Sequence, residues 1–223
     1  MDDKTCSNAG DDIMERMMVP YVCDVTNQTQ VENMIQNIIQ DWGGIDILVN
    51  NAGTAQQPKG PVDTLDAENL SSLLQLNVVA QHIVTSTVLR LNAIPSSGVG
   101  HILQISSKAG KVGLENYSFY VASKFALEGL TSSWSKELKN RNIVVTSLSP
   151  GAINTQSFPK PSGKKGVRSV ESIKDAVMMS LTAPMKYTGH YLHADELDLI
   201  RSKGLPDIKA WKSIDEIPIE DSS

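Results

Sequence analysis

A tyrosine and a lysine stand four positions apart at the start of a strongly apolar segment, in Tyr120-Val121-Ala122-Ser123-Lys124. If the segment is helical, both side chains lie on one face of the helix. An ammonium held beside a phenol favours the phenolate, so we expect Lys124 to lower the pKa of Tyr120 from its usual value of about 10. Such a phenol can exchange a proton near neutral pH. Ordinary amphipathic helices also carry this spacing, so the pair alone does not define a site.

Three apolar stretches run directly into small polar residues, which indicates buried strands that end in turns. The junctions are Asn50-Asn51-Ala52-Gly53 after 45–49, Ser106-Ser107 after 101–105, and Ser149-Pro150-Gly151 after 143–148. The carboxyl ends of parallel strands share one edge of a sheet, where open α/β folds bind ligands. We therefore expect these turns and Tyr120 to meet at one site.

With these features in this order, the chain resembles the short-chain dehydrogenase/reductase family over roughly residues 19–195. The motifs that carry the resemblance are Asp24-Val25-Thr26, Asn50-Asn51-Ala52-Gly53, Leu76-Asn77-Val78, Ser107, Tyr120-x-x-x-Lys124 and Ser149-Pro150-Gly151. Six motifs in register are far more specific than any one of them.

The resemblance implies a catalytic role for four residues. Tyr120 would protonate a substrate carbonyl oxygen, or accept the proton of the matching alcohol, while a nicotinamide exchanges hydride with the carbon. Lys124 would lower the Tyr120 pKa and hydrogen-bond the nicotinamide ribose. Ser107 would donate to the substrate oxygen, with Ser106 as the alternative. Asn77 would hold a water that connects Lys124 to solvent.

The resemblance also implies a dinucleotide cofactor, NADP or NAD, without indicating which. Its expected contacts are Asp24, Asn51, Ala52, Gly53, Tyr120, Lys124, Pro150, Gly151 and Thr155. Some of these have a simpler structural interpretation. Asp24 either accepts from the adenine amino group or caps the helix that follows. Gly53 either belongs to a backbone turn against the cofactor or is needed only for its turn geometry, and Thr155 either contacts the nicotinamide amide or caps a short turn.

Alternating strand and helix patterns predict the fold that must position these residues. Strands are expected at 19–23, 45–49, 101–106, 143–148 and 191–193, and helices at 28–42, 67–91, 118–139 and 170–181. Thr26 or Asn27 would cap the first of these helices and Gly43-Gly44 would end it. This order predicts an α/β, Rossmann-like, doubly wound fold with a mostly parallel sheet, in a single domain over residues 1–203 with a loose tail at 204–223.

One family feature is absent from the sequence. The family opens with a strand and a Thr-Gly-x-x-x-Gly-x-Gly turn that binds the pyrophosphate at a helix N-terminus, and no such turn occurs here. Only 23 residues precede Asp24, fewer than a first βαβ unit needs. We therefore expect an N-terminally truncated domain with weakened cofactor affinity, and uncovered apolar surface unless the strand at 19–23 moves across to pair with 45–49.

Composition narrows the function classes. The chain has 223 residues, is 40% hydrophobic and carries a formal charge of −5, which suits a globular protein and argues against nucleic-acid binding. The basic stretch 160–168 is interpreted as a solvated loop rather than a phosphate contact. Two cysteines form no disulfide framework, the histidines show no metal spacing, and neither a signal peptide nor a membrane span is expected. These features predict a cytoplasmic protein with no membrane partner.

Two function hypotheses follow. The first is an NAD(P)-dependent oxidoreductase that interconverts a small or medium-sized carbonyl substrate and its alcohol. The second is a non-catalytic, truncated family member that acts as a dimerising or interaction protein. Either would pair as a homodimer or homotetramer through the helices at 67–91 and 118–139, as the resemblance implies. A serine hydrolase fits less well, because Ser107 has no histidine partner at a plausible position.

Overall fold

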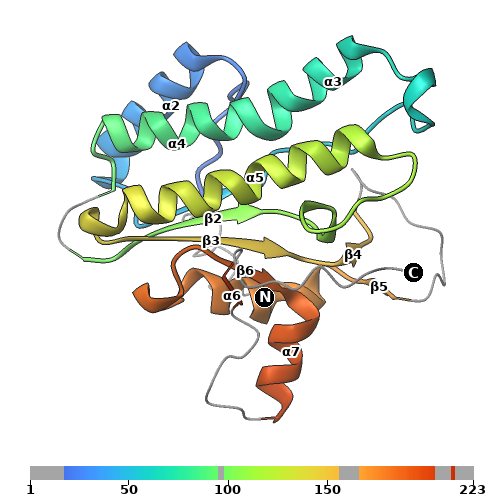
Figure 1. Ribbon diagram of the computed structural model, residues 1–223. Helices are drawn as coiled ribbons and strands as arrows, with labels where there is room; N and C mark the ends of the chain where they lie inside the picture. Colours follow the sequence, from blue (N-terminus) through green and yellow to red (C-terminus); the bar gives the residue numbers. More distant parts are fainter. Residues whose placement is uncertain (1–17, 95–97, 156–165, 204–211, 214–223) are drawn as a thin grey trace, which may run out of the picture.

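The computed structural model describes residues 18–94, 98–155, 166–203 and 212–213. Over these residues the chain is a single α/β domain with a central sheet between two helical layers (Figure 1). One layer consists of α2 (Gln28–Trp42), α3 (Ala67–Leu74), α4 (Ala80–Arg90) and α5 (Ser118–Glu137), and the other of α6 (Lys174–Leu181) and α7 (Ala194–Lys203). The expected Rossmann-like class is confirmed.

The sheet is parallel except at one edge, and its strand order is β1-β2-β3-β6-β7. Its strands are β1 (Ile47–Asn50), β2 (Gly100–Ile105), β3 (Ile143–Ser149), β6 (His190–His193) and the antiparallel β7 (Lys212–Ser213). Gln104 lies beside Asn50 on one side and Ser147 on the other, and Ser147 lies beside Tyr191. One row across the sheet therefore carries polar side chains.

Short elements complete the chain between these helices and strands. A separate sheet of two strands follows β3, formed by β4 (Ala152–Ile153) and β5 (Val167–Arg168). The 3₁₀ turns are η1 (Val62–Thr64), η3 (Lys108–Gly110), η4 (Lys139–Arg141), η5 (Glu171–Ile173) and η6 (Met185–Tyr187). A π-helical segment, η2 (Gln75–Val79), joins α3 to α4.

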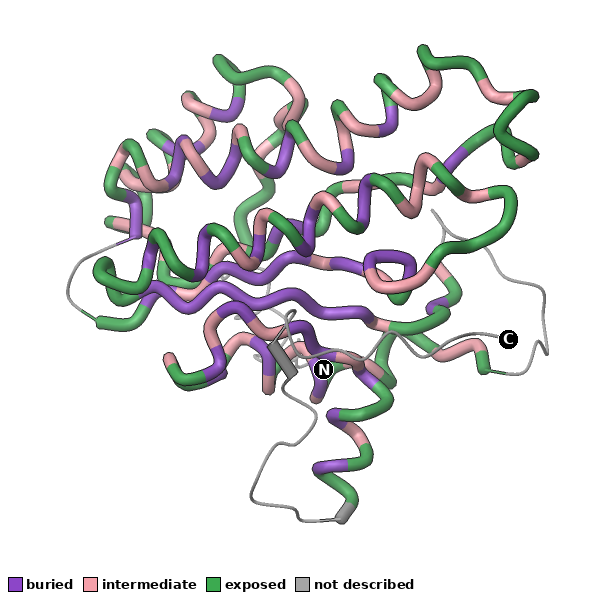
Figure 2. Tube along the Cα trace, viewed as in Figure 1, coloured by how far each residue is buried: buried purple, intermediate pink, exposed green. Residues whose placement is uncertain are grey.

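Apolar packing on both faces of the sheet holds the layers together. All seven residues of β3 are buried, and β2 is nearly as enclosed (Figure 2). On one face Ile102, Val145 and Val88 pack with α2, α4 and the end of α5. On the other face Leu148 and Leu192 pack with Leu197 and its neighbours in α6 and α7. A strand that is buried on both faces has a continuous run of apolar residues, which explains why these strands could be predicted from the sequence.

Local signals set the ends of α2 as predicted. The Asn27 side chain accepts a hydrogen bond from the Gln30 backbone N–H at 3.1 Å, which makes Asn27 the N-cap residue. Gly43 ends the helix with φ +80°, a left-handed conformation in which its N–H donates to Ile39 O.

The predicted strand at 19–23 is not formed. Residues 18–24 have an extended but unpaired backbone, and among the described residues β1 is hydrogen-bonded only to β2. Ile47 and Val49 of β1 remain 42% and 41% exposed, and Val22 is fully exposed. The segment does not move across to pair with β1, so the expected apolar surface is left uncovered. A strand needs a hydrogen-bonding neighbour, and no described segment supplies one here.

Two further predictions are corrected at the C-terminal side. Helix α7 was not expected, although Ala194, Leu197 and Ile200 recur at helical spacing and are buried against the sheet. The tail was expected to be loose, but residues 212–213 add β7 to the sheet beside β6. The Met-rich segment 10–18, which the sequence indicates as the end of a helix, lies outside the described residues except for Met18, as do residues 156–165, half of the irregular stretch 149–168.

The continuous helical stretch Ala67–Arg90 is long and apolar enough, by length and composition, to cross a membrane. In the fold its α4 part contacts α2, and its α3 and η2 parts contact α5 (Figure 1). Leu73, Val84 and Val88 are among its buried residues. Of its most apolar window, 39% is buried within the protein.

Candidate active site

The Tyr120–Lys124 pair lies in the first turns of α5, over the carboxyl end of β2. Lys124 Nζ is 5.6 Å from the centre of the Tyr120 ring. The same nitrogen donates a 2.9 Å hydrogen bond to the backbone oxygen of Ile105, the last residue of β2. The structure therefore places the phenol and the ammonium on one helix face, as their spacing predicted.

The acid–base properties of the pair differ from the expectation. Burial raises the pKa of Tyr120, and the neighbouring Ser107 side chain lowers it only in part. Burial also lowers the pKa of Lys124 to about 8, against an opposing effect of the Glu128 carboxylate. The prediction that Lys124 lowers the Tyr120 pKa is wrong for this structure, because desolvation of the phenol outweighs its polar neighbours. Lys124 is the group of the pair that titrates nearer to neutral pH.

The two candidate serines after β2 have different surroundings. Ser107 is the N-cap residue of η3, where its Oγ accepts from the Ala109 N–H at 3.2 Å, and it faces Tyr120 closely enough to affect the phenol. Ser106 is only 3% exposed, and its Oγ has no hydrogen-bond partner among the described residues. This geometry favours Ser107 over Ser106 as the hydroxyl beside the phenol.

Asn77 is fully buried in η2, a π-helical segment of the kind that often marks functional sites. Its Nδ2 donates to Thr54 O at 3.0 Å and to Ser123 Oγ at 3.2 Å, and its Oδ1 accepts from Thr54 N at 2.8 Å. Ser123 in turn donates to Tyr120 O at 2.7 Å. Asn77 thus ties the turn after β1 to the start of α5. Its expected role in holding a water stays a prediction.

The turn after β1 approaches this amide closely. A Cβ on Gly53 would lie 3.2 Å from Asn77 Oδ1, so a larger residue would push the turn away from η2. Gln81 donates to the backbone oxygen of Ala52 at 3.0 Å, while the side chains of Asn51 and Ala52 are exposed. Buried side chains thus hold the inner side of this turn, and its outer side is exposed at the carboxyl edge of the sheet.

Gln56 is a site residue that the sequence reasoning missed. It is 1% exposed, and its Oε1 accepts from the backbone N–H groups of Phe119 at 3.0 Å and Tyr120 at 3.1 Å. Its Nε2 donates to Pro58 O at 3.2 Å and Asn116 O at 3.3 Å. The amide satisfies N–H groups of the first turn of α5 from a distant loop. No local pattern marks a residue that caps a helix more than sixty positions away.

Asp24 is committed to its own turn rather than to α2. Its Oδ1 accepts from Thr26 N at 2.9 Å and from Thr26 Oγ1 at 2.7 Å, and these bonds lower the pKa of the carboxyl group. Asn27, not Asp24, caps the helix. The helix-capping alternative for Asp24 is therefore wrong, and its contact with an adenine stays a prediction.

The remaining expected cofactor contacts follow β3. Pro150 and Gly151 continue directly from its carboxyl end, and Gly151 has φ +80°, a left-handed conformation that favours glycine. Thr155 comes two residues after β4. These residues follow the strand next to β2, so the three strand-end turns line one edge of the sheet, as the sequence predicted.

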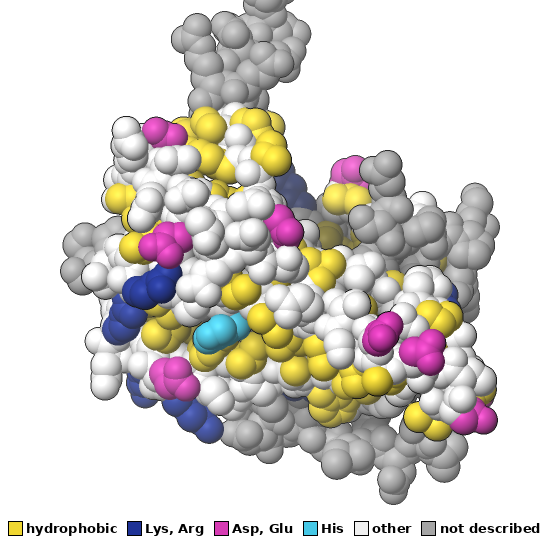
Figure 3. Space-filling model, turned by 90° about the horizontal axis from the view of Figure 1, so that it is seen from above, with side chains coloured by type: hydrophobic (Ala, Val, Ile, Leu, Met, Phe, Trp, Pro, Cys, Tyr) yellow, Lys and Arg dark blue, Asp and Glu magenta, His cyan; other side chains and the backbone are white. Residues whose placement is uncertain are grey.

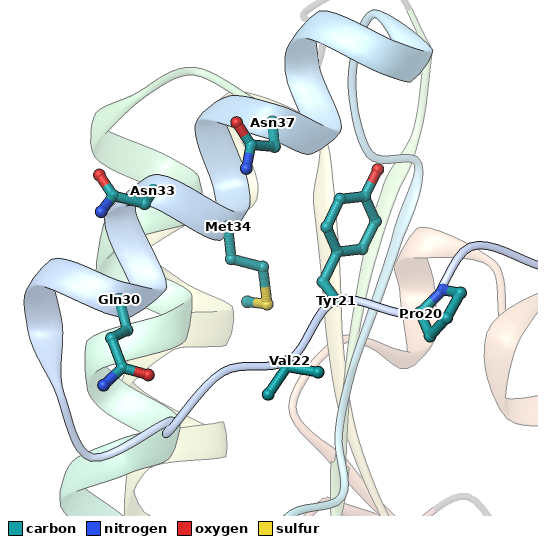
Figure 4. A pocket seen from close by; sticks show the side chains of 7 residues that line it. All are labelled: Pro20, Tyr21, Val22, Gln30, Asn33, Met34 and Asn37. Carbon is teal, nitrogen blue, oxygen red and sulfur yellow. The ribbon is translucent and has the colours of Figure 1, made fainter.

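A cavity of about 340 Å³ lies elsewhere, between the segment Pro20–Val22 and α2. Gln30, Asn33, Met34 and Asn37 line its helix side, and the thioether of Met34 points toward Val22 (Figure 4). It shares no residue with the Tyr120 site. Over the part of the chain described, no three His, Cys, Asp or Glu side chains cluster as a metal site would require.

Comparisons with known proteins agree with the fold. A family model described as short chain dehydrogenase matches residues 3–165. The 3-oxoacyl-[acyl-carrier-protein] reductase FabG of Thermotoga maritima is 33% identical over 141 residues, which cover 63% of this chain and 56% of the relative. The 3-dehydrosphinganine reductase of Danio rerio is 30% identical over 182 residues, covering 74% and 54% respectively. The matched region thus spans little more than half of these curated relatives.

Solved structures give the same result. ElxO with NADP bound superposes with a TM-score of 0.73 at 24% identity, covering 81% of this chain and 77% of ElxO. A short-chain type dehydrogenase/reductase from Mycobacterium marinum has a TM-score of 0.59 at 30% identity, covering 66% and 58%. The fold and site define a Rossmann-like α/β protein in which Ser107, Tyr120 and Lys124 meet at the carboxyl end of β2. The chain belongs to the short-chain dehydrogenase family.

Burial of Lys124 predicts a pH dependence of stability. The folded-state pKa of about 8 lies below the ordinary value of 10.5, so between these values the unfolded chain binds more protons and the free energy of unfolding rises with pH. The full effect is about 3 kcal/mol. Urea denaturation between pH 7 and about 9, below the range where tyrosines titrate, measures the first part of this rise, about 1.4 kcal/mol. Lys124→Met should remove the rise, and an equal slope in both proteins contradicts the prediction.

The contacts of Gln56 predict a large cost of its removal. Gln56→Leu leaves buried N–H groups at the start of α5 without acceptors, so the free energy of unfolding should fall by about 3 kcal/mol. Gln57→Leu is the matched control, because Gln57 is exposed and adjacent. Urea denaturation of both variants tests this. Equal stability of the two variants would show that Gln56 does not hold the helix.

Proposed function

We propose that this chain is an NAD(P)-dependent oxidoreductase that interconverts a ketone or aldehyde and its alcohol, with Tyr120 as the acid–base group. The observation that carries the proposal is the convergence of Tyr120, Lys124 and Ser107 at the carboxyl end of β2. Relatives named as reductases and a neighbour solved with NADP support it. They do not favour the second hypothesis, a non-catalytic interaction protein.

The residues present fit the nicotinamide end of such a cofactor. The exposed turn Asn51-Ala52-Gly53 and the turn Pro150-Gly151 flank the end of β2, with Thr155 beyond. Gly53 supports this fit, since any Cβ there would crowd Asn77 and shift the turn. Asp24 is exposed and keeps Oδ2 for an adenine amino group.

A bound nicotinamide supplies or accepts the hydride. Tyr120, whose raised pKa keeps the phenol protonated at neutral pH, donates its proton to the carbonyl oxygen during reduction. Ser107 donates to the same oxygen as negative charge develops there. Lys124 is a nearby cation that favours the phenolate once the proton has left. In alcohol oxidation the proton moves in the opposite direction.

The proposal includes a small or medium-sized substrate, a cytoplasmic setting and self-association. Seen from above, the helical layer carries a band of apolar side chains (Figure 3). Val79 in η2 and Phe125 in α5 are 40% and 47% exposed. Exposed apolar side chains on these helices support pairing as a homodimer or homotetramer.

The first test is binding followed by turnover. Titration of NADH and NADPH, read by nicotinamide fluorescence, should give a Kd below the millimolar range for at least one of them. With that cofactor and a panel of ketones and aldehydes, Tyr120→Phe should lower kcat by a factor of about 10² to 10⁴, because the proton donor is lost. Tyr21→Phe is the control, since it removes a phenol that donates to Asp41 at the surface. Absence of binding of either nucleotide at millimolar concentration rejects the proposal.

A second test separates the two serines. Ser107→Ala should lower kcat about 10²-fold, since a donor to the developing oxyanion is lost. Ser106→Ala should change kcat by less than about twofold, because its buried hydroxyl makes no hydrogen bond with the described residues. Steady-state kinetics of both variants measure the difference. The reverse order of effects would transfer the role to Ser106.

A further inference from the structure

A buried carboxylate lies one helical turn behind Lys124. Glu128 is 2% exposed and shares the face of α5 that carries Tyr120 and Lys124. Its Oε2 accepts from Ser147 Oγ at 2.9 Å and lies 3.1 Å from Lys111 Nζ. Its Oε1 has no hydrogen-bond partner among the described residues. A buried carboxylate is costly unless cations and donors compensate it.

Two lysines supply the compensating charge. Lys111 comes from the segment just after η3, and its side chain is only 12% exposed. Lys124 is 6% exposed, and its Nζ is hydrogen-bonded to Ile105 O. The buried cluster therefore contains two ammonium groups and one carboxylate.

Apart from Glu196 of α7, whose charge also acts on Tyr191, the other groups that face this cluster are neutral at pH 7. Tyr120 comes from α5 itself, and Tyr191 comes from β6, where its ring lies 4.7 Å from Lys111 Nζ. Burial raises the pKa of both phenols. Strands β2 and β3 contribute the uncharged Gln104 and Ser147. Glu128 is thus the one anion that faces Lys124 within the described residues at neutral pH.

We propose that Glu128 is a positioning residue for the Tyr120–Lys124 centre, and that its carboxylate keeps the buried Lys124 ammonium charged and hydrogen-bonded to Ile105 O. The catalytic meaning of this proposal rests on the proposed function. The charge state of Lys124 is a property of the chain alone and is measured without cofactor or substrate.

The physical argument is a balance between desolvation and attraction. Burial disfavours the ammonium and lowers the Lys124 pKa to about 8, while the Glu128 charge acts in the opposite direction. Charge–charge attraction is strong where water is excluded, so a carboxylate one turn away carries much of this balance. Without it the ammonium would lose its proton near or below neutral pH, and Lys124 would no longer favour the phenolate.

The alternative is that Glu128 only anchors Lys111 and Ser147. The test is an NMR titration of lysine side chains labelled with ¹³C at Cε and ¹⁵N at Nζ, in which Lys124→Met assigns the Lys124 signal. In Glu128→Gln the Lys124 midpoint should fall by about one pH unit or more. Glu137→Gln is the control, because Glu137 lies exposed at the end of the same helix. An unchanged midpoint in folded Glu128→Gln overturns the proposal.

A second variant gives the opposite sign and guards against a misfolded first variant. Lys111→Met removes the ammonium that competes with Lys124 for the Glu128 carboxylate. The carboxylate then interacts with Lys124 alone, so the titration midpoint of Lys124 should rise. Simple structural damage would admit water and move the midpoint toward its ordinary value in both variants. A fall with Glu128→Gln and a rise with Lys111→Met therefore support the proposal. Shifts of the same sign in both variants reject it.

The pH dependence of carbonyl reduction provides the functional readout. In Glu128→Gln the high-pH limb of kcat/KM should move to lower pH in parallel with the NMR midpoint, while kcat on the low-pH plateau is retained. A uniform loss of kcat without movement of the limb would indicate a merely structural role. If the wild-type chain shows no turnover, the proposed function fails, and the NMR titration still decides the inference about Glu128.

Discussion

Burial of the Lys124 ammonium between α5 and the end of β2 is the constraint on which the site depends. A buried ammonium needs acceptors and a compensating charge, and Ile105 O and Glu128 supply them. The acceptor fixes the position of α5 over β2. Helix α5 then places Tyr120 beside Ser107, the second residue after β2. Desolvation that is costly for stability thus also gives Lys124 a pKa near 8.

Side-chain amides keep the start of α5 in register with the turn after β1. Gln56 satisfies two N–H groups of the first turn, and Asn77 joins Thr54 to Ser123. Both amides are almost fully buried, and their hydrogen-bonding groups are engaged by fixed partners. The turn that is proposed to contact the cofactor and the helix that carries the acid–base group are therefore mechanically coupled. A displacement of the turn or of the helix therefore strains the hydrogen bonds that join the two.

The exposed edge of β1 contrasts with this well-packed centre. Ile47 and Val49 are more than two-fifths exposed, and the segment before α2 is unpaired within the described residues. A flat, apolar strand edge is a ready site for pairing with another strand. Tyr120, Lys124 and Ser107 thus lie over the end of β2, which is paired on both sides, and not at this edge.

Sequence alone was sufficient for much of the fold and for the prediction that Tyr120, Lys124 and Ser107 lie together at one edge of the sheet. The caps of α2, the buried strands β2 and β3 and the Tyr120–Lys124 spacing are local patterns, since periodicity and turn residues act over a few positions. The order of the strand-end turns followed from these patterns and from the family resemblance. Helix α7 carried a readable signal that was overlooked, in the spacing of Ala194, Leu197 and Ile200.

Tertiary structure decided what depends on segments distant in the chain. Gln56 caps α5 and Lys111 pairs with Glu128 because the fold brings these distant segments together. Residues 19–23 stay unpaired because no described strand lies beside them. The direction of the Tyr120 pKa also reversed, because the spacing to Lys124 is local whereas burial of the phenol is not. Residue types and spacing determined which groups meet. Packing determined how much water each group keeps, and therefore its charge.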